Sequence, residues 1–358
     1  MTQLRLAFYP FDFADPNNYL SRMRDAIVLA YPEIEIVNMP GRFKDFIKVD
    51  VVWLNWYENF SGRNRAYYLY HAVRRWLKLL VFKCCGTKII YTVHNRQPHE
   101  TQYSALNRLF YKCVFSLVDN IVILSDLTRD VIKETGGKKF SGKIIKIPHP
   151  TYLCPKKKYQ DNPEGFTVLF FGLLRPYKNI EMLLSVAAIH PEIAGAALDL
   201  NYADSLKKAA SGLNNVHLIL RRLTDEEINE LMDEASVLAL PYDLKSSLNS
   251  GAAMFAFSKG LNVVIPNIGT ILELSNRDKV YGYDYDNDSE HQSKFENALK
   301  KAHEDFTSDY SQFVRNSEIL REEVLSSNSG GVNVCELGVY ECVTMPLRHT
   351  DFEEYARA

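Results

Sequence analysis

The stretch Ser246–Glu273, SSLNSGAAMFAFSKGLNVVIPNIGTILE, is the part of the sequence from which the fold is predicted. An apolar run, Ser236–Tyr242, leads into its polar loop, and small apolar residues follow, so the chain is predicted to turn from strand to helix with Ser or Asn at the cap. A helix start of this kind attracts phosphate through its unpaired N–H groups and its dipole. Ser250, Gly251 and Ala252 are therefore candidates for holding the diphosphate of a nucleotide-linked substrate, although the pattern also fits an ordinary helix cap in an α/β domain.

Composition limits the class of protein. The chain has 358 residues, 46% hydrophobic and 24% charged, which suits a globular protein with two cores. The net charge of −2 argues against a dedicated nucleic-acid binder. Six cysteines without metal-ligand spacing indicate reduced thiols in a cytoplasmic protein. No signal peptide or membrane-spanning run is found, so any membrane contact is expected to be peripheral, at the inner face of the cell membrane.

Predicted strands and helices alternate along most of the chain. The strand segments are rich in Val and Ile, which is typical of parallel strands buried on both faces. The first series of predicted strands is Leu4–Tyr9, Glu33–Asn38, Val49–Trp56, Lys88–His94, Asn120–Ser125 and Lys143–Pro148. The second series is Phe166–Gly172, Ala196–Tyr202, Val216–Leu220, Ser236–Tyr242 and Asn262–Pro266.

A polar stretch with two prolines, Thr151–Gly165, separates the two series and is predicted to link two domains. We therefore expect an α/β protein with two doubly wound, Rossmann-like domains, residues 1–155 and 156–335, facing each other across a ligand-binding cleft. Residues 336–358 are expected to form helices that pack back on the N-terminal domain. Acidic residues alternate in the segment DYDND before a helix predicted to start near Ser289, which favours a helix N-terminus over a metal site.

Several segments resemble GT-B glycosyltransferases, most closely bacterial exopolysaccharide and capsule enzymes of the group 1, family 4-like type. In the second half these are VLFFGLLRPYKNIEMLL (Val168–Leu184), the segment His217–Tyr242, and the stretch quoted first. In the first half they are KIIYTVHNRQPHE (Lys88–Glu100) and KIIKIPHPTY (Lys143–Tyr152). The resemblance implies transfer of a sugar from a UDP- or GDP-sugar donor to a saccharide or lipid-linked saccharide acceptor, an EC 2.4 activity in surface polysaccharide synthesis, with no cofactor or metal.

One departure from the family concerns the donor loop. Many retaining members carry two glutamates, one for the sugar and one for the ribose, whereas the matching positions here are Ser247 and Phe255. Glu273 or the Asn249 side chain is expected to do part of that work. The departure leaves the donor's identity and the stereochemical course open.

The resemblance implies a donor site around the glycine turn at Gly172. Arg175 and Lys178 follow this turn and are suited to stabilising the negative charge of the leaving diphosphate, with the Ser250–Gly251 helix start assisting. Arg222 lies in the segment whose loop faces the nucleotide base in the family. The remaining donor-binding candidates are those named above.

Acceptor and catalytic candidates follow the strands of the first half. His94 ends a predicted strand and is expected to contact the transferred sugar, and Glu100 is the candidate base if the enzyme inverts. The predicted acceptor-binding residues are Asp12, Asn55, Glu58 and His99. For Asp12, Asn55 and Glu58, capping of loops remains the other interpretation.

The stretch Gly62–Gly86 combines aromatic and basic residues on a predicted helix, and Asn107–Val118 is similar. Such a helix suits an anionic membrane surface, and core packing against the sheet accounts for it equally well. Two other functions remain open for the chain as a whole: a catalytically silent GT-B-like scaffold, which the missing glutamates favour, and a sugar-nucleotide epimerase of the same fold.

Overall fold

The computed structural model describes residues 3–10, 19–59, 64–96, 104–136, 138–152, 154–161, 163, 165–186, 190–197 and 199–329. The chain divides into two compact units, which are taken separately below. Unit 1 comprises Met1–Pro148 and Ser329–Ala358, and unit 2 comprises His149–Asn328, so the predicted linker belongs to unit 2. The helices expected over 336–358 lie outside the described residues.

Unit 1 is built on a six-stranded parallel sheet in the order β2-β1-β3-β4-β5-β6. The strands are β1 (Leu4–Tyr9), β2 (Ile34–Val37), β3 (Val51–Asn55), β4 (Lys88–Val93), β5 (Asn120–Ile123) and β6 (Ile144–Lys146). The helices are α1 (Tyr19–Ala30), α2 (Phe43–Phe46), α3 (Arg65–Cys84), α4 (Ser104–Leu117), α5 (Leu127–Gly136) and the 3-10 helix η1 (Lys138–Lys143). All six predicted strands of the first half are confirmed, each shortened by a few residues at most.

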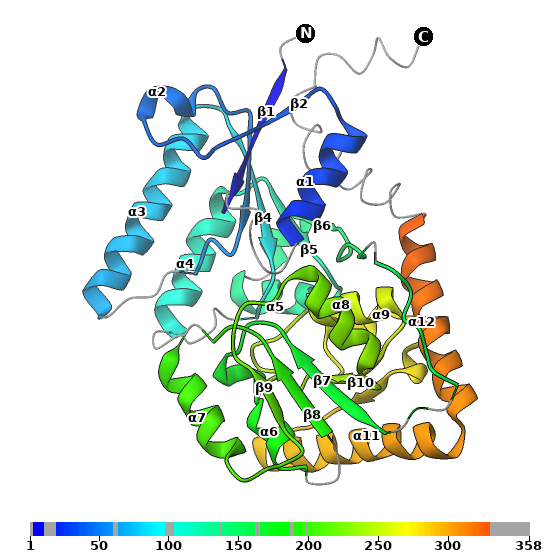
Figure 1. Cartoon of the computed structure of the whole chain (residues 1–358). Coiled ribbons are helices and arrows are strands. Elements are labelled where there is room, and N and C mark those ends of the chain that lie inside the picture. The colour runs from blue at the N-terminus through cyan, green and yellow to red at the C-terminus, as the bar shows by residue number, and fades with distance from the viewer. Residues whose placement is uncertain are drawn as a thin grey trace, which may run out of the picture. The chain divides into compact units, whose positions relative to one another are not determined.

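The order of the strands in unit 1 reverses between β1 and β3. The chain moves from β1 to β2 on one side and from β3 through β6 on the other, so α1 covers one face of the sheet while α3 and α4 cover the opposite face (Figure 1). The strands are buried on both faces, as the apolar runs predicted: every residue of β3 and β4 is buried. The carboxyl ends of β1 and β3 therefore form a topological switch point, where open sheets bind ligands.

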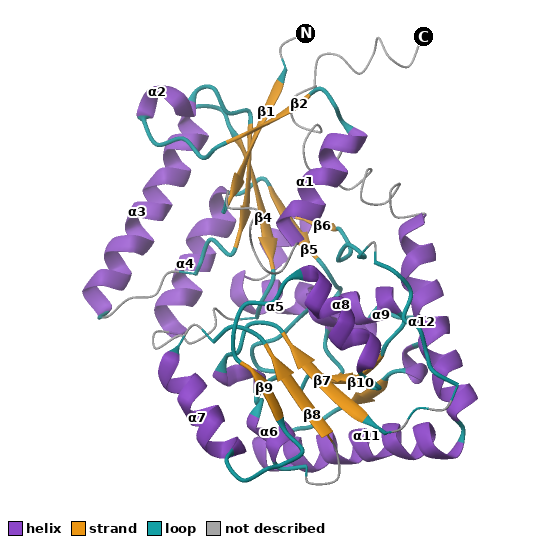
Figure 2. Ribbon diagram, viewed as in Figure 1, coloured by secondary structure: helices purple, strands orange, loops and turns teal. Residues whose placement is uncertain are grey.

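Unit 2 contains a second six-stranded parallel sheet, in the order β12-β11-β10-β7-β8-β9. Figure 2 shows its strands β9, β8, β7 and β10. The strands are β7 (Thr167–Phe171), β8 (His190–Ala194), β9 (His217–Ile219), β10 (Val237–Ala239), β11 (Asn262–Pro266) and β12 (Tyr281–Tyr283). The helices are η2 (Pro176–Lys178), α6 (Glu181–Leu184), α7 (Leu200–Ala210), α8 (Asp225–Glu234), α9 (Gly251–Lys259), α10 (Gly269–Leu272), η3 (Arg277–Lys279), α11 (Asp288–Ser308) and α12 (Tyr310–Ser329). Here the switch point lies between β7 and β10.

One predicted strand of unit 2 is wrong. The segment Ala196–Tyr202 was expected to be a strand, but the strand is β8, and Leu200 already belongs to α7. The Asp199 side chain accepts a hydrogen bond from the Asn201 N–H (2.9 Å) and caps this helix. The apolar residues were therefore misassigned because a helix cap interrupts them, and Pro191 made the true strand look unsuitable for the interior of a sheet.

No described helix combines the length and apolarity needed to cross a bilayer. Within the described residues, no three His, Cys, Asp or Glu side chains gather as they would around a metal ion. The acidic segment 284–288 instead leads into α11, whose start at Asp288 confirms the predicted helix start. Asn287 caps this helix by accepting from the Glu290 N–H.

Candidate functional site

The loops after β7 and β10 are joined by two hydrogen bonds at the switch point of unit 2. The Asn179 Nδ2 group donates to the Pro241 carbonyl (3.0 Å), and the Asp243 N–H donates to the Tyr177 carbonyl (3.2 Å). Asn179 has φ 50°, a left-handed conformation that Asn adopts more readily than most residues. These contacts fix the first loop, which carries Gly172, Arg175 and Lys178, against the second.

Two glycines let the backbone after β7 approach that after β8. Gly172 has φ 127° and Gly195 has φ 154°, and the Gly172 N–H donates to the Ala194 carbonyl (3.1 Å). A Cβ atom on Gly195 would lie 1.8 Å from the Gly172 carbonyl oxygen, so only glycine fits there. A Cβ on Gly172 would lie 3.3 Å from Lys178 Nζ. The predicted glycine turn therefore also makes room for the ammonium group of Lys178.

Lys178 points its ammonium group at aromatic rings. Its Nζ atom lies 5.6 Å from the ring centroids of both Phe170 and Tyr242. The side chain of Lys178 as a whole is half-buried, and its ammonium end is the part that the two rings enclose. Burial, together with the nearby charge of Arg175, lowers the pKa of Lys178 to about 7. A ligand that brought negative charge to this group would bind with uptake of a proton.

The start of α9 forms the other half of the site. The Ser250 Oγ atom accepts from the Ala253 N–H (3.1 Å), and the Ser250 N–H donates to Thr270 Oγ1 (2.9 Å), which confirms the predicted cap. The N–H groups of Gly251 and Ala252 belong to the first turn and have no acceptor within the helix. The α9 start thus combines a buried cap with two N–H donors, as a phosphate site requires.

Tyr242 connects the two halves. Its ring faces the Lys178 ammonium group, and its side chain lies near that of Ser250 at the α9 start. Burial raises the pKa of Tyr242 to about 12 in spite of the nearby Ser250 side chain, so the phenol is neutral. Tyr242 was not predicted as a site residue. Its position just after a buried strand at a switch point was the one signal in the sequence that could have identified it.

The two positions that the family resemblance matches to donor-loop glutamates, Ser247 and Phe255, are buried and partly buried, respectively. Ser247 is buried, and Phe255 packs its ring on Tyr152 (4.9 Å between centroids) and edge-on to Phe171 (5.9 Å). Next to them, the Asn249 Nδ2 group is buried and has no hydrogen-bond partner in the described part of the chain. A buried amide donor without a partner requires an explanation, and a ligand at the α9 start would provide one.

Two further predicted donor residues lie at the surface. Arg222 is exposed in the loop between β9 and α8, beside an ion pair of Arg221 with Glu227 (2.6 Å). Glu273 is exposed at the C-terminus of α10. Their donor-binding roles stay predictions.

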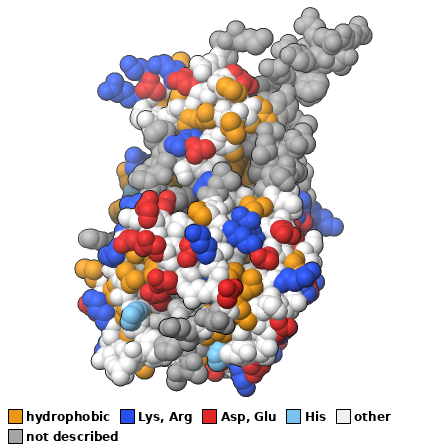
Figure 3. Space-filling view, turned by 45° about the vertical axis from the view of Figure 1, so that its right-hand side comes forward, with side chains coloured by type: hydrophobic (Ala, Val, Ile, Leu, Met, Phe, Trp, Pro, Cys, Tyr) orange, Lys and Arg blue, Asp and Glu red, His pale blue; other side chains and the backbone are white. Residues whose placement is uncertain are grey.

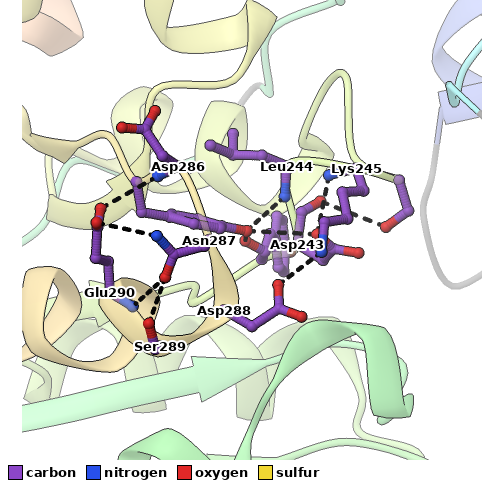
Figure 4. A network of polar contacts seen from close by, with 11 residues as sticks. Asp243, Leu244, Lys245, Asp286, Asn287, Asp288, Ser289 and Glu290 are labelled. Carbon is purple, nitrogen blue, oxygen red and sulfur yellow. Dashed lines mark hydrogen bonds and ion pairs between the residues drawn. The ribbon is translucent and has the colours of Figure 1, made fainter.

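A second layer of polar contacts braces the loop after Tyr242 (Figure 4). Asp243 Oδ1 accepts from the Lys245 N–H (2.9 Å), and Lys245 Nζ pairs with Asp288 (2.7 Å), the first residue of α11. The Tyr285 hydroxyl accepts from the Leu244 N–H (2.8 Å). The loop after Tyr242 is thereby held on both sides. Residues after β7 contact it on one side, and residues after β12 contact it on the other.

In unit 1, His94 and Asn55 meet at the carboxyl ends of β4 and β3. The His94 Nε2 atom lies 3.0 Å from Asn55 Oδ1, and the imidazole stacks on Trp56 (4.1 Å between centroids, 20° between planes) with Tyr19 edge-on (4.8 Å). Both His94 and Asn55 are buried. Asn55 also donates to the Tyr9 carbonyl (3.4 Å) at the end of β1.

Glu58 is buried and hydrogen-bonded within unit 1. It is 2% exposed, its carboxylate accepts from the Tyr91 hydroxyl, and burial raises the pKa of its carboxyl group. This environment favours a structural role for Glu58, which holds the turn after β3 against β4. Asp12, His99 and Glu100 lie outside the described residues.

The chain was compared with known proteins by sequence and by structure. No protein-family model matches the chain, and no curated protein matches it in sequence. Among solved structures, the Anabaena Alr3699/HepE complex with UDP and glucose aligns with a TM-score of 0.69 at 13% identity, covering 94% of this chain and 98% of that one. A glycosyltransferase from Rickettsia africae ESF-5 aligns with a TM-score of 0.61 at 14% identity, covering 97% and 100%. The apo structure of OtsA aligns with a TM-score of 0.57 at 9% identity, covering 91% of this chain and 78% of that one.

These identities are low, so the matches establish the fold. The chain has the GT-B fold expected from its sequence, with two parallel six-stranded sheets covered by helices.

Proposed function

We propose that this protein is a glycosyltransferase that moves a sugar from a nucleoside-diphosphate sugar to a saccharide or lipid-linked saccharide. The observation that carries the proposal is that Lys178, in contact with Tyr242, and the α9 start follow the two neighbouring strands β7 and β10. A cation and a helix N-terminus after neighbouring strands suit a diphosphate, and these strands flank the switch point where open sheets bind nucleotides.

The chemistry follows from the leaving group. When the glycosidic bond to the diphosphate breaks, negative charge grows on the phosphate oxygens, and Lys178, Arg175 and the α9 N–H groups can stabilise it. Their combined positive charge makes a metal ion unnecessary, so we propose metal-independent transfer. Activity insensitive to EDTA is the expected result, and activity restored only by Mg²⁺ or Mn²⁺ would overturn this part of the proposal.

Uracil is the base we propose for the donor, with guanine second. The support is that solved structures of Alr3699/HepE, which share the fold over nearly the full chain, contain UDP and UDP-glucose. The packing of Phe255 means that no carboxylate from that position reaches the ribose, so the exposed Glu273 and the unpartnered amide of Asn249 are the proposed replacements.

The acceptor side is proposed for unit 1, at His94 and Asn55, with Asp12, His99 and Glu100 as further candidates. Support comes from the pairing of a buried imidazole and a buried amide at strand carboxyl ends. We propose a role in bacterial surface polysaccharide or glycolipid synthesis, for which a cytoplasmic enzyme at the inner face of the membrane is suited.

The membrane contact itself is proposed for α3 and α4. Tyr70, Val73 and Leu77 form an exposed stripe at helical spacing on α3, with Tyr67 one turn earlier, and Leu109 is exposed on α4. Neither helix contains Asp or Glu, whereas together they contain seven lysines and arginines. On the face in Figure 3, by contrast, cations and anions are interspersed. A cationic surface with exposed aromatic and aliphatic side chains matches an anionic bilayer.

Thermal stabilisation by a panel of UDP, GDP, ADP, CMP and dTDP, alone and as sugar conjugates, tests the proposed function. A nucleotide at about a hundred times its dissociation constant adds about 2.7 kcal/mol of stability. Lys178→Ala should lose this response, and Lys207→Ala, on the exposed face of α7, is the matched control. Stabilisation followed by transfer of labelled sugar supports the proposal. Binding with neither transfer nor hydrolysis identifies a silent scaffold, and an isomerised sugar identifies an epimerase.

A further inference from the structure

The turn after β3 presents Trp56 at the switch point of unit 1. The strand order reverses between β1 and β3, and Trp56 is the first residue beyond the carboxyl end of β3. Its neighbours Asn55, Tyr57 and Glu58 are all buried, whereas Trp56 is only partly buried. One large aromatic side chain therefore keeps part of its surface accessible at the edge of the sheet where ligands bind.

The backbone of Trp56 adopts a costly conformation. Its φ of 48° lies in the left-handed region, which a bulky residue rarely adopts and which costs on the order of 1–3 kcal/mol. Glycine or asparagine would adopt this φ at lower cost. Tryptophan occupies a position where glycine would fit the backbone best, which indicates that the indole ring itself is needed.

Contacts from several elements hold the turn in this conformation. The Asn59 N–H donates to the Trp56 carbonyl (2.9 Å), and the Arg75 guanidinium of α3 donates to the Tyr57 carbonyl and to the Asn59 carbonyl (3.1 Å). The Tyr91 hydroxyl holds the Glu58 carboxylate from β4. A strained residue persists where its surroundings over-determine it, and here these surroundings fix the residues on both sides of Trp56.

The indole ring itself is supported from within. It stacks on the imidazole of His94 and receives Tyr19 edge-on (5.9 Å between centroids). The ring is thus rigid and apolar, and the polar groups of His94 and Asn55 lie next to it. Binding sites combine apolar aromatic surface with a few such fixed polar groups, and the C–H face of a pyranose ring is the complement of a flat aromatic surface.

We propose that Trp56 is the stacking platform for a pyranose ring of the acceptor saccharide, with the His94 imidazole, positioned by Asn55, beside it. This inference rests on the proposed function and adds the acceptor's chemical class and contact residue. No bond is made or broken by Trp56, so its effect is on acceptor binding.

The test uses the full chain labelled with 5-fluorotryptophan. The sequence has three tryptophans, so the ¹⁹F spectrum has three resonances, assigned with Trp56→Phe and Trp76→Phe. Methyl glucoside, methyl galactoside, methyl mannoside, N-acetylglucosamine and cellobiose are titrated, with glycerol as the control. At least one saccharide should shift the Trp56 resonance and leave those of Trp53 and Trp76 in place. A Trp56 resonance that no saccharide moves, or that glycerol moves equally, overturns the proposal.

Two variants separate a binding role from a structural one. Trp56→Ala should weaken saccharide affinity by at least about tenfold, the size of one well-formed aromatic contact, and Trp56→Tyr should retain most of it. UDP stabilisation should be the same in both variants and in the wild type. Unchanged saccharide affinity in Trp56→Ala contradicts the inference. Failure of UDP to stabilise even the wild type counts against the donor site instead, whatever Trp56 does.

Discussion

The ammonium group of Lys178 lies 5.6 Å from the centroid of the Tyr242 ring. The cation that follows β7 is therefore in contact with a residue of the loop that leads from β10 to the start of α9. The arrangement is held by backbone contacts at Asn179 and Asp243, so it exists before any ligand arrives. Preorganised charge of this kind is what lowers the barrier of a reaction that develops negative charge.

The first prediction concerns the pH dependence of UDP binding. The free protein has a Lys178 pKa of about 7, and a bound diphosphate raises it, so the contribution of Lys178 to affinity is complete below that pH. Affinity should fall from about pH 7 to about pH 9, by up to tenfold per pH unit. Isothermal titration calorimetry in buffers of different ionisation enthalpy measures both the affinity and the proton uptake. Lys178→Arg, which stays charged, should remove the pH dependence, and a flat wild-type profile would contradict the assignment.

The second prediction concerns the glycine contact. Gly195→Ala places a methyl group 1.8 Å from the Gly172 carbonyl oxygen and should lower the free energy of unfolding by more than about 3 kcal/mol. Gly212→Ala is the control, because Gly212 has φ 91° but no atom within 4 Å of the added carbon, so only the conformational cost of about 1 kcal/mol applies. Urea denaturation measures both. Equal losses in the two variants would mean that the loops after β7 and β8 are not in close contact.

The third prediction separates the two roles of Ser250. Ser250→Ala removes a helix cap and should cost about 1 kcal/mol of stability, and it should also weaken UDP binding. Asn287→Ala removes a cap of the same kind from α11 and should cost a similar amount without changing UDP affinity. Paired denaturation and UDP titration of the two variants give the comparison. Equal loss of UDP affinity in both would show that the effect is on folding alone.

The fourth prediction concerns the cationic face of α3. Val73→Glu with Leu77→Glu should weaken binding to phosphatidylglycerol-containing vesicles about tenfold or more, because both side chains are exposed and the change adds repulsive charge. Leu200→Glu on α7, 78% exposed, is the matched control. Vesicle flotation at low and high salt measures the binding. Wild-type binding that equals binding to phosphatidylcholine vesicles, or that ignores salt, would exclude this surface.

Much of the fold could be predicted because buried parallel strands leave continuous apolar runs in the sequence. The cap at Ser250 was equally predictable, since a polar loop followed by small apolar residues is typical of a helix start. The strand His190–Ala194 was missed because it contains Pro191 and lies next to a more apolar segment that belongs to a helix. The local sequence pattern cannot tell which of the two segments is the strand. The contact that distinguishes them, between Gly195 and Gly172, joins the ends of two strands that are separate in the sequence.

The parts of the site that could not be predicted depend on distant contacts. Lys178 was predicted from its charge and its place after a strand, but its lowered pKa comes from enclosure by Phe170 and Tyr242. The left-handed backbone of Trp56 leaves no trace in the sequence either, because propensity alone would place Gly or Asn there. Such outliers are imposed by surrounding structure and are visible only once the fold is known.

The reversal of strand order in unit 2 has a consequence for synthesis on the ribosome. Val168 of β7 pairs with Val237 of β10, yet β8, β9 and the helices η2, α6, α7 and α8 are made between them. The half of the sheet that emerges first therefore waits with one edge of β7 unpaired until β10 and α9 follow. The proposed nucleotide site needs α9, so it can form only after residues 251–259 have emerged, and nascent chains that stall before α9 cannot be stabilised by the donor.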